Sequence, residues 1–267
     1  MRASESKAMM AASAGVVWLA SVLAASAARA GPAILPSGST VAGETLPQYT
    51  ARWWQSALQV PYTTQSPLTD PTGARASRGD VGPVTFLYGG SSPDPVTNIS
   101  RSATIRDDFV FFPVLNAFFT KTSLDDPATT EADLRAMAVQ SIDEARSLYA
   151  TIDGVPVPQS ELLEHREASP VFTLDLPADN IFSEFGLPAE HIDLTVSDGY
   201  WLMLEPLGPG RHTLAFGGQF GPSFNSTLNV TYDLNVVPLP APVAMALTTL
   251  PLAAAFGWRA MRRLDAE

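Results

Sequence analysis

Leu228-Asn229-Val230-Thr231-Tyr232-Asp233-Leu234-Asn235-Val236 is the stretch that decides the fold. Large apolar side chains alternate along it, one by one, with polar side chains. Because successive side chains of a β-strand point to opposite faces, this alternation places one face in a core and the other in water. We therefore predict a half-buried strand over 228–236, the last strand of the fold.

Five shorter runs upstream are rich in β-branched and aromatic residues, and we predict them as strands too: 84–88, 109–115, 171–176, 192–196 and 200–204. Gly208-Pro209-Gly210 is turn chemistry, which predicts a hairpin joining 200–204 to a strand over 211–216 that ends at Gly217-Gly218. Strands separated by turns, without alternating helices, favour a mainly β fold: an antiparallel β-sandwich or a jelly-roll-like domain.

Two accessory helices interrupt this pattern. Thr45-Leu46-Pro47-Gln48 fits a capping box and predicts a short helix that runs to about Val60. Thr130 is a suitable N-cap, with acidic residues in the turn that follows it, and apolar residues at helical spacing extend the second predicted helix to Tyr149. The Pro- and Gly-rich stretches 61–73 and 91–95 are predicted to be surface loops.

The composition limits the chemistry. The chain has 267 residues, of which 46% are hydrophobic, so it is long and apolar enough to bury a core. A formal net charge of −11 argues against nucleic acid as a partner, because phosphate binding requires a basic face. The absence of cysteine excludes disulfides, thiolate nucleophiles and Cys-ligated metals. No cofactor is expected, although the acidic composition leaves calcium open.

The N-terminus has the order of a secretory signal peptide. Arg2 and Lys7 precede an apolar, Ala-rich run, which closes on Ala28-Arg29-Ala30, a pattern that signal peptidase can cleave. We predict cleavage after residue 30, so that the mature chain begins at Gly31. An uncleaved membrane anchor is the alternative.

The C-terminus has a different order. An apolar run from Ala241 to Trp258 follows a Pro-rich tract and is followed by Arg259, Arg262 and Arg263. Eighteen residues of helix span about 27 Å, which is close to the thickness of the bilayer core, and the arginines favour the cytoplasmic side. We predict a C-terminal transmembrane helix, which Pro251 would kink. A buried core helix is the alternative.

Val237-Pro238-Leu239-Pro240-Ala241, the apolar helix and the arginine cluster together resemble a PEP-CTERM sorting signal of the VPLPA type. The Asp265-Ala266-Glu267 ending departs from that pattern. The resemblance implies recognition by an exosortase-type processing enzyme in a Gram-negative bacterium that makes exopolysaccharide. It implies transit to the periplasmic side of the inner membrane, then to the cell surface or extracellular matrix. The chain would then comprise a signal peptide (1–30), an exported β-rich domain (31–236) and a sorting tail (237–267).

The exported body also resembles a group of secreted bacterial proteins of unknown function. The resemblance covers most of the mature chain, and the segments that carry it are 49–55, 82–87, 111–116, 152–157, 197–201 and 212–218. It implies no reaction and no ligand.

Adjacent aromatic residues are the candidate binding residues. Trp54, Tyr200 and Trp201, together with Trp53, could stack on sugar rings, since extracellular domains often grip glycans with aromatic faces. Core packing is the alternative, because large aromatic side chains also supply much of the buried area of a domain of this size.

Carboxylates and histidines give weaker signals. Asp198 and Glu205 form the most suggestive catalytic pair, but a spacing of seven residues does not place them together in space. The three histidines, His165, His191 and His212, lack a metal-binding spacing. Acidic residues in predicted loops could bind calcium, although none sits in an EF-hand-like loop: Asp70, Asp80, Asp107, Asp108, Asp125 and Asp126.

These observations favour a non-enzymatic protein of the cell surface or extracellular matrix that contacts exopolysaccharide. Two alternatives remain open at this point: a secreted glycan-active enzyme that uses carboxylates of the body, and a calcium-stabilised adhesion module.

Overall fold

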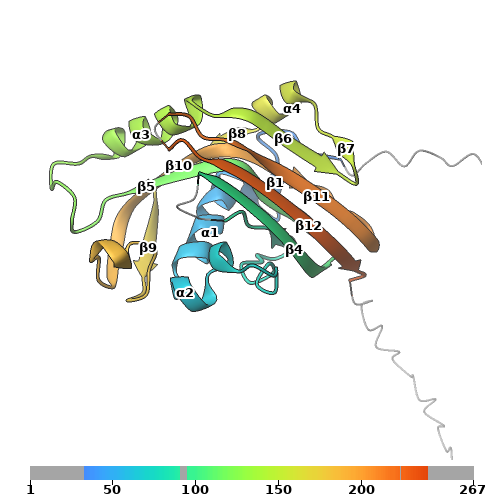
Figure 1. The fold of residues 1–267 in the computed structure, drawn as a ribbon, viewed down its shortest axis with the longest axis horizontal. Helices are drawn as coiled ribbons and strands as arrows, with labels where there is room; N and C mark the ends of the chain where they lie inside the picture. The colour runs from blue at the N-terminus through green and yellow to red at the C-terminus, as the bar shows by residue number, and fades with distance from the viewer. Residues whose placement is uncertain (1–32, 91–94, 223, 240–267) are drawn as a thin grey trace, which may run out of the picture.

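Two five-stranded β-sheets frame the structure, a computed structural model that describes residues 33–90, 95–222 and 224–239 (Figure 1). Sheet I has the order β3–β5–β10–β8, and β9 also pairs with β10. Sheet II has the order β4–β12–β11–β6–β7. The bounds in sheet I are β3 Val84–Phe86, β5 Phe109–Thr120, β8 Arg166–Ala168, β9 Phe172–Leu176 and β10 Glu190–Leu204. Those in sheet II are β4 Val96–Arg106, β6 Arg146–Ile152, β7 Val155–Pro156, β11 Gly210–Gln219 and β12 Thr227–Val237.

Short helices and a small ribbon surround the sheets. The α-helices of the described residues are α1 (Leu46–Leu58), α2 (Tyr62–Gln65), α3 (Glu131–Asp143) and α4 (Gln159–Glu164). Two 3₁₀ turns, η1 (Pro67–Thr69) and η2 (Ser183–Phe185), and a ribbon of β1 (Thr40–Val41) and β2 (Glu44–Thr45) complete them. The described residues therefore contain more α-helices than the two that were predicted. α2 lies in a stretch predicted to be loop, and α4 was not predicted.

Sheet I is buried on both faces. On β5, Phe112 and Val114 belong to a core cluster that also contains the inward side chains of sheet II. Phe111, which precedes Phe112, belongs to a second cluster with α1 and Trp201 of β10. The layers are therefore sheet II, sheet I and α1. The buried residues of both clusters lie between Val41 and Val236, within the domain predicted over 31–236.

The strand predicted over 228–236 is confirmed as β12. Val230, Tyr232, Leu234 and Val236 are at most 3% exposed, whereas the polar residues Thr231, Asp233 and Asn235 between them are exposed. The mainly β fold is likewise confirmed, with two sheets packed face to face.

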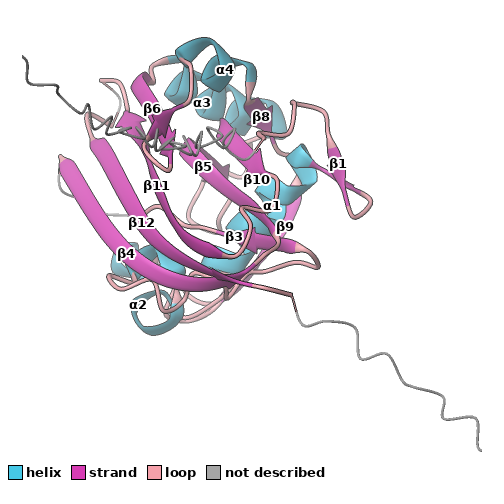
Figure 2. Cartoon of the chain, turned by 90° about the vertical axis from the view of Figure 1, so that its right-hand side faces the viewer, coloured by secondary structure: helices cyan, strands magenta, loops and turns pink. Residues whose placement is uncertain are grey.

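The expected antiparallel arrangement is wrong in two places. β4 pairs in parallel with β12 along its whole length, and β3 pairs in parallel with β5. β4 itself was not predicted, because Val96–Arg106 has few large apolar residues, and most of its exposed positions are Ser, Thr or Asn. Figure 2 shows β4 at the edge of sheet II, beside β12.

The predicted hairpin across Gly208-Pro209-Gly210 is also wrong. Its first strand is the end of β10 in sheet I, and its second strand is β11 in sheet II. The turn therefore crosses from one sheet to the other, where Gly208 N–H donates to Asp107 Oδ1 (2.8 Å). The runs predicted as two strands, 192–196 and 200–204, are one continuous strand, β10.

The first predicted helix is confirmed as α1, and its Thr45 capping box forms as expected. The second is shorter than predicted. α3 ends at Asp143, and 146–152 forms β6, in which Leu148, Ala150 and Ile152 alternate into the core. Met137, expected on the apolar stripe of the helix, is 39% exposed.

The predicted signal peptide (1–30), the predicted transmembrane helix (241–258) and the arginine cluster lie outside the described residues. Of the Pro-rich tract, Val237 ends β12, and Pro238 and Leu239 follow it. No helix within the described residues is long and apolar enough to cross a membrane.

Candidate functional site

The four candidate aromatic residues are buried. Trp53 is 1% exposed, Trp54 6%, Tyr200 8% and Trp201 0%. Trp53 forms the centre of an aromatic cluster, edge-on to Trp201 (ring centroids 5.4 Å apart) and to Trp54 (4.8 Å). The rings of Tyr200 and Trp201 therefore offer no open face on which a sugar could stack. Trp53 and Trp54 differ from them, since both line a cavity described below.

Asp198 is committed to an ion pair within the fold. It is 3% exposed, and Arg166 of β8 donates to it from Nη2 (2.8 Å) and from Nε. Arg166 also donates to Asp143 at the end of α3 (2.6 Å), so this arginine connects sheet I to that helix. These hydrogen bonds, chiefly the one with Asp198, raise the pKa of Arg166.

Glu205 does not join Asp198 in a cleft. It is exposed, and it follows the last residue of β10, the strand on which Asp198 lies. Seven residues of extended strand span about 23 Å, whereas the two carboxyl groups of a glycosidase lie about 5–9.5 Å apart. This pair therefore lacks the geometry for glycoside hydrolysis.

The aspartates of the predicted loops accept hydrogen bonds, most of them from groups of their own loops. Asp70 accepts from the backbone N–H groups of Thr72 and Arg75 (2.9 and 2.8 Å), and these bonds lower its pKa against the opposing effect of burial. Asp125 and Asp126 likewise accept from Thr122 and Ala128 in their own loop. Asp107 accepts from the Gly208 turn. Among the described residues, no three His, Asp or Glu side chains converge as a metal site would require.

Asp80 and Asp108 lie near each other beneath the start of β5. Burial raises the pKa of Asp80 to about 6, although the Phe86 N–H and the Thr85 hydroxyl donate to it and oppose this shift. Arg106 Nε lies 2.9 Å from Asp108 Oδ2 and also lowers the pKa of Asp80, while Asp108 raises it. This cluster is a source of pH-dependent stability.

The histidines belong to three separate contacts. His165 is 4% exposed, and its ring nitrogens face Glu161 O (2.7 Å) and Leu35 O (2.9 Å). His212 lies between Asp153 Oδ2 (2.8 Å) and Gly208 O (2.9 Å). His191 is exposed beside Asp175, whose hydrogen bond raises its pKa. None of the three adjoins a nucleophile within these contacts.

The outer side of sheet II carries a broad polar surface, which we name the polar face. Its side chains come from neighbouring strands in register: Asn98 lies beside Asn229, Ser100 beside Thr231, and Thr104 beside Asn235. The members on β4 are Asn98, Ser100, Ser102 and Thr104; on β12, Asn229, Thr231 and Asn235; on β11, Thr213; and on β6, Tyr149 and Thr151. All ten are uncharged and exposed or half-buried, and the exposed carboxylate of Asp233 lies among them, in register with Ser102 on one side and Thr213 on the other.

A hydrogen-bonded row orders one end of the polar face. Asn229 Nδ2 donates to Asn98 Oδ1 (3.0 Å), and the Tyr149 hydroxyl donates to Asn229 Oδ1 (3.1 Å). Gly217 lies between Tyr149 and Asn229 in the sheet, and without a side chain it leaves room for Tyr149 to reach across. A Cβ atom at Gly217 would meet Leu228 O at 1.9 Å, so the backbone of β12 leaves no room for a side chain at this position.

Charged groups lie around Thr213, within and beside the polar face. A shallow hollow there is lined by Asp153, Arg211, His212, Thr213, Asp233 and Leu234. The polar face was missed from the sequence because it requires the parallel register of β4 and β12, although the alternating Ser, Thr and Asn residues of β4 are its local signal. No family model, curated protein or solved structure matches the chain.

Proposed function

We propose that this is an exported, non-enzymatic protein of the cell surface or extracellular matrix, whose polar face contacts neutral stretches of exopolysaccharide. The observation that carries the proposal is the set of ten uncharged polar side chains aligned across four strands of sheet II, with the carboxylate of Asp233 among them. Among the described residues, Ser100, Ser102, Thr104, Thr231 and Asn235 of this face are exposed.

The chemistry of the polar face suits a hydroxyl-rich polymer. Hydroxyl and amide groups both donate and accept, as sugar hydroxyls do. Adjacent strands place these groups about 4.8 Å apart, and alternate residues along a strand place them about 6.6 Å apart, so several neighbouring hydroxyls can be met at once. Tyr149, half-buried in the row with Asn229, adds an aromatic edge.

We further propose that the tail sorts the protein as the VPLPA resemblance implies: an exosortase-type enzyme processes it near Val237–Ala241, and its apolar helix is held in the membrane beforehand. The strand that leads into the tail supports this, since β12 ends at Val237, which is 37% exposed, and Leu239 is 51% exposed. A processing enzyme could therefore reach this tract without unfolding the sheet.

The enzymatic and calcium-dependent alternatives have less support. Asp198 is paired with Arg166 and lies far along the strand from Glu205, and the loop aspartates bind their own backbones. The polar face therefore favours a binding function over hydrolysis of a glycan.

Binding to polysaccharide tests the proposal. We expect the full-length protein, held in phospholipid nanodiscs, to sediment with insoluble neutral glucans, and with the exopolysaccharide of its own cell, more strongly than empty nanodiscs do. Changing Ser100 and Thr231 together to Glu should abolish this binding, because two buried charges at the contact would have no partner. The matched control is Ser77→Glu with Ser160→Glu, at exposed serines that are not members of the polar face.

Retained binding by the Ser100→Glu/Thr231→Glu variant, with an unchanged melting temperature, would refute the role of the polar face. Equal loss of binding in the control variant would show that added negative charge alone is responsible, which would also refute it.

A further inference from the structure

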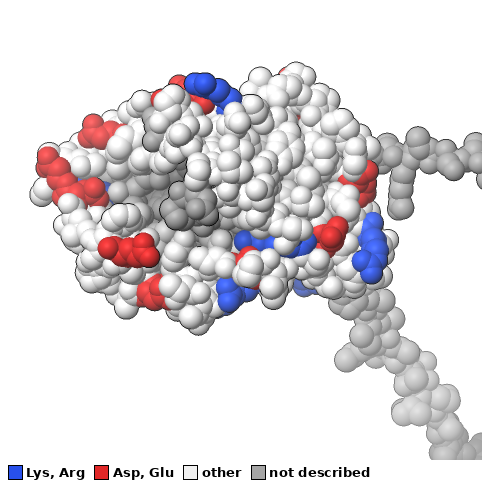
Figure 3. All heavy atoms as spheres, viewed as in Figure 1, with Lys and Arg blue, Asp and Glu red and all other residues white. Residues whose placement is uncertain are grey.

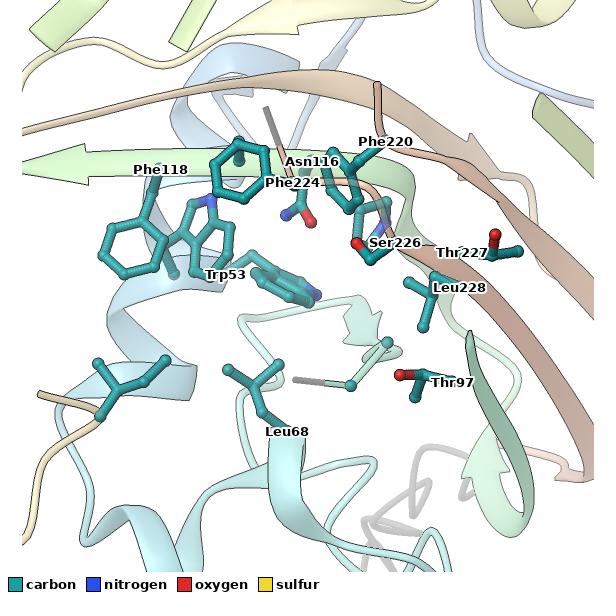
Figure 4. A pocket seen from close by; sticks show the side chains of 16 residues that line it. Trp53, Leu68, Thr97, Asn116, Phe118, Phe220, Phe224, Ser226, Thr227 and Leu228 are labelled. Carbon is teal, nitrogen blue, oxygen red and sulfur yellow. The ribbon is translucent and has the colours of Figure 1, made fainter. Parts of the chain in front are cut away.

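A second site lies away from the polar face, where α1 meets β5 and the loop between β11 and β12. It is a cavity of about 240 Å³, bounded by Trp53 and Trp54 of α1, Asn116 and Phe118 of β5, and Phe224 of the loop. Figure 4 shows the amide group of Asn116 extending between the ring of Trp53 and those of Phe220 and Phe224. The cavity is larger than the engineered cavity of about 150 Å³ that accepts benzene in another protein, so a small organic molecule fits.

The walls are apolar and uncharged. None of the sixteen described residues that line the cavity is Asp, Glu, Lys, Arg or His. Thr97, Ser226 and Thr227 add hydroxyl groups on the side of sheet II. Figure 3 shows charged side chains of both signs on this side of the molecule, including a group below the centre of the view. A charged ligand would find no counter-ion on these walls, so they favour a neutral one.

Two donors in the wall lack acceptors. The indole Nε1 of Trp54 and the amide Nδ2 of Asn116 are buried and have no hydrogen-bond partner among the described residues. Neighbouring Trp53, by contrast, donates from Nε1 to Leu87 O (2.9 Å). Because a buried donor without an acceptor costs about 1–3 kcal/mol, native proteins rarely keep two in one place. A ligand that brings an acceptor to these donors would remove that cost.

The cavity continues into an apolar groove. Phe118, Ile181 and Phe224 line both. Beyond them the groove is lined by Phe119, Leu124, Phe182, Phe185 and Leu187, with Thr120, Thr122 and Asp125 at its border. Phe185 is 76% exposed, Leu124 60% and Phe224 51%, an unusual gathering of large apolar side chains at a surface. An elongated ligand could therefore lie partly in the cavity and partly along the groove.

We infer that this cavity and groove bind a neutral acyl compound, an amide or ester with an alkyl chain. Its carbonyl oxygen accepts from Trp54 Nε1 and Asn116 Nδ2, and its alkyl chain lies along the groove toward Phe182 and Phe185. A carboxylate fits less well, because it would be buried without a cation. An alkylammonium fits worst, because it has no acceptor for the two donors. The site is independent of the polar face.

Equilibrium dialysis with three eight-carbon probes tests this inference: octanamide, octanoate and octylammonium. The protein is the full chain in phospholipid nanodiscs, and empty nanodiscs supply the blank. We expect one saturable octanamide site per chain, with at least about tenfold weaker binding of the two charged probes, the ratio that one or two hydrogen bonds provide. Ser226→Phe should abolish the site by filling the cavity from the loop. Ser160→Phe, the same change at an exposed position on α4, should leave it intact.

Two further variants test the donors. Trp54→Phe and Asn116→Leu should each reduce the preference for octanamide over octanoate, while a thermal melt reports whether the fold is retained. The inference is overturned if the protein shows no saturable octanamide binding above that of empty nanodiscs. The same result is expected if another segment of the chain already fills the site, and it would overturn the inference equally. It is also overturned if Ser226→Phe binds octanamide as the unaltered protein does, or if all three probes bind equally.

Discussion

Arg101 and Tyr232 hold each other inside the fold: Arg101 Nη1 donates to the Tyr232 hydroxyl (3.0 Å), which in turn donates to Tyr88 O (2.9 Å). Arg101 is 3% exposed, and its other donors reach the carbonyl oxygens of Asp70, Tyr88, Gly89 and Pro67. A buried guanidinium thus connects β4 to β12 and to the chain before and after β3. No carboxylate is among its hydrogen-bond partners in the described residues.

Arg101→Ala should destabilise the protein strongly. Several buried carbonyl oxygens would lose their donor together, so we expect a loss of at least about 3 kcal/mol in the free energy of unfolding. Urea unfolding of the variant measures it. Arg78→Ala, at an exposed arginine, should change the value by less than about 0.5 kcal/mol. Similar values for the two variants would contradict the role given to Arg101.

Trp53→Ala tests the aromatic core. The ring is 1% exposed and packs on Tyr88 and Trp201, so its removal should cost about 3–5 kcal/mol. Phe185→Ala, at a ring that is 76% exposed, should cost far less. A melting temperature unchanged by Trp53→Ala would show that this residue is not part of the core.

Asp198→Asn should weaken the attachment of α3. It removes the buried charge that Arg166 binds, and we expect a loss of about 1–3 kcal/mol. Asp143→Asn removes the other partner of Arg166, but this carboxylate is 57% exposed. Because exposed ion pairs contribute at most about 1 kcal/mol to the free energy of unfolding, this variant should lose less than Asp198→Asn does. Thermal unfolding of both variants measures which of them loses more stability. A larger loss in Asp143→Asn than in Asp198→Asn would refute the importance given to the buried partner of Arg166.

Asp80 should make stability depend on pH. Its pKa is raised by burial to about 6, above its ordinary value of 3.8, so the folded state binds the proton more tightly than the unfolded state does. The stability that this group contributes is full below pH 4 or so and is lost as the pH rises through 6. Asp80→Asn should therefore stabilise the protein at pH 7, by up to about 3 kcal/mol, but not at pH 4.

Urea unfolding of both proteins between pH 4 and 7 measures this difference. Asp126→Asn, at an exposed carboxylate, is the control and should follow the unaltered protein. If the advantage of Asp80→Asn were the same at every pH, its cause would not be the titration of this group.

The tail is tested by cell fractionation. We expect the full-length chain to be membrane-associated before processing, and a version ending at Pro238 to be soluble on the exported side, because it retains all of β12. Intact-mass measurement of each mature form locates any cleavage near Val237–Ala241. Identical soluble partitioning of the two versions, with an unprocessed C-terminus, would refute the sorting role.

Local patterns predicted some of the fold. The alternation in β12 specifies one wet and one buried face whatever the strand pairs with, and the Thr45 capping box marks the start of α1 through contacts a few residues apart. The end of α3 was misjudged because Ala145, Leu148 and Tyr149 also satisfy helical spacing. The alternation of Leu148, Ala150 and Ile152 is the signal that would have corrected it.

Other features depend on partners distant in the sequence. The Gly208-Pro209-Gly210 turn has hairpin chemistry in isolation, and only the packing of the two sheets decides that β10 and β11 separate there. The polar face needs the parallel register of β4 with β12, and the cavity needs α1, β5 and the β11–β12 loop together. Such sites leave no motif in one segment. Of the candidate aromatic residues, Trp53 and Trp54 line the cavity, and Tyr200 and Trp201 do not.

The parallel pairing of β4 with β12 has a mechanical consequence. β12 lies in the interior of sheet II, bonded to β4 on one side and to β11 on the other over nearly its whole length (Figure 2). Tension applied beyond Val237 pulls along the strand axis and loads both ladders at once in shear. Strand β12 cannot peel away one hydrogen bond at a time, as an edge strand pulled sideways would. A body tethered through its last strand is therefore held at the point where its sheet best resists extraction.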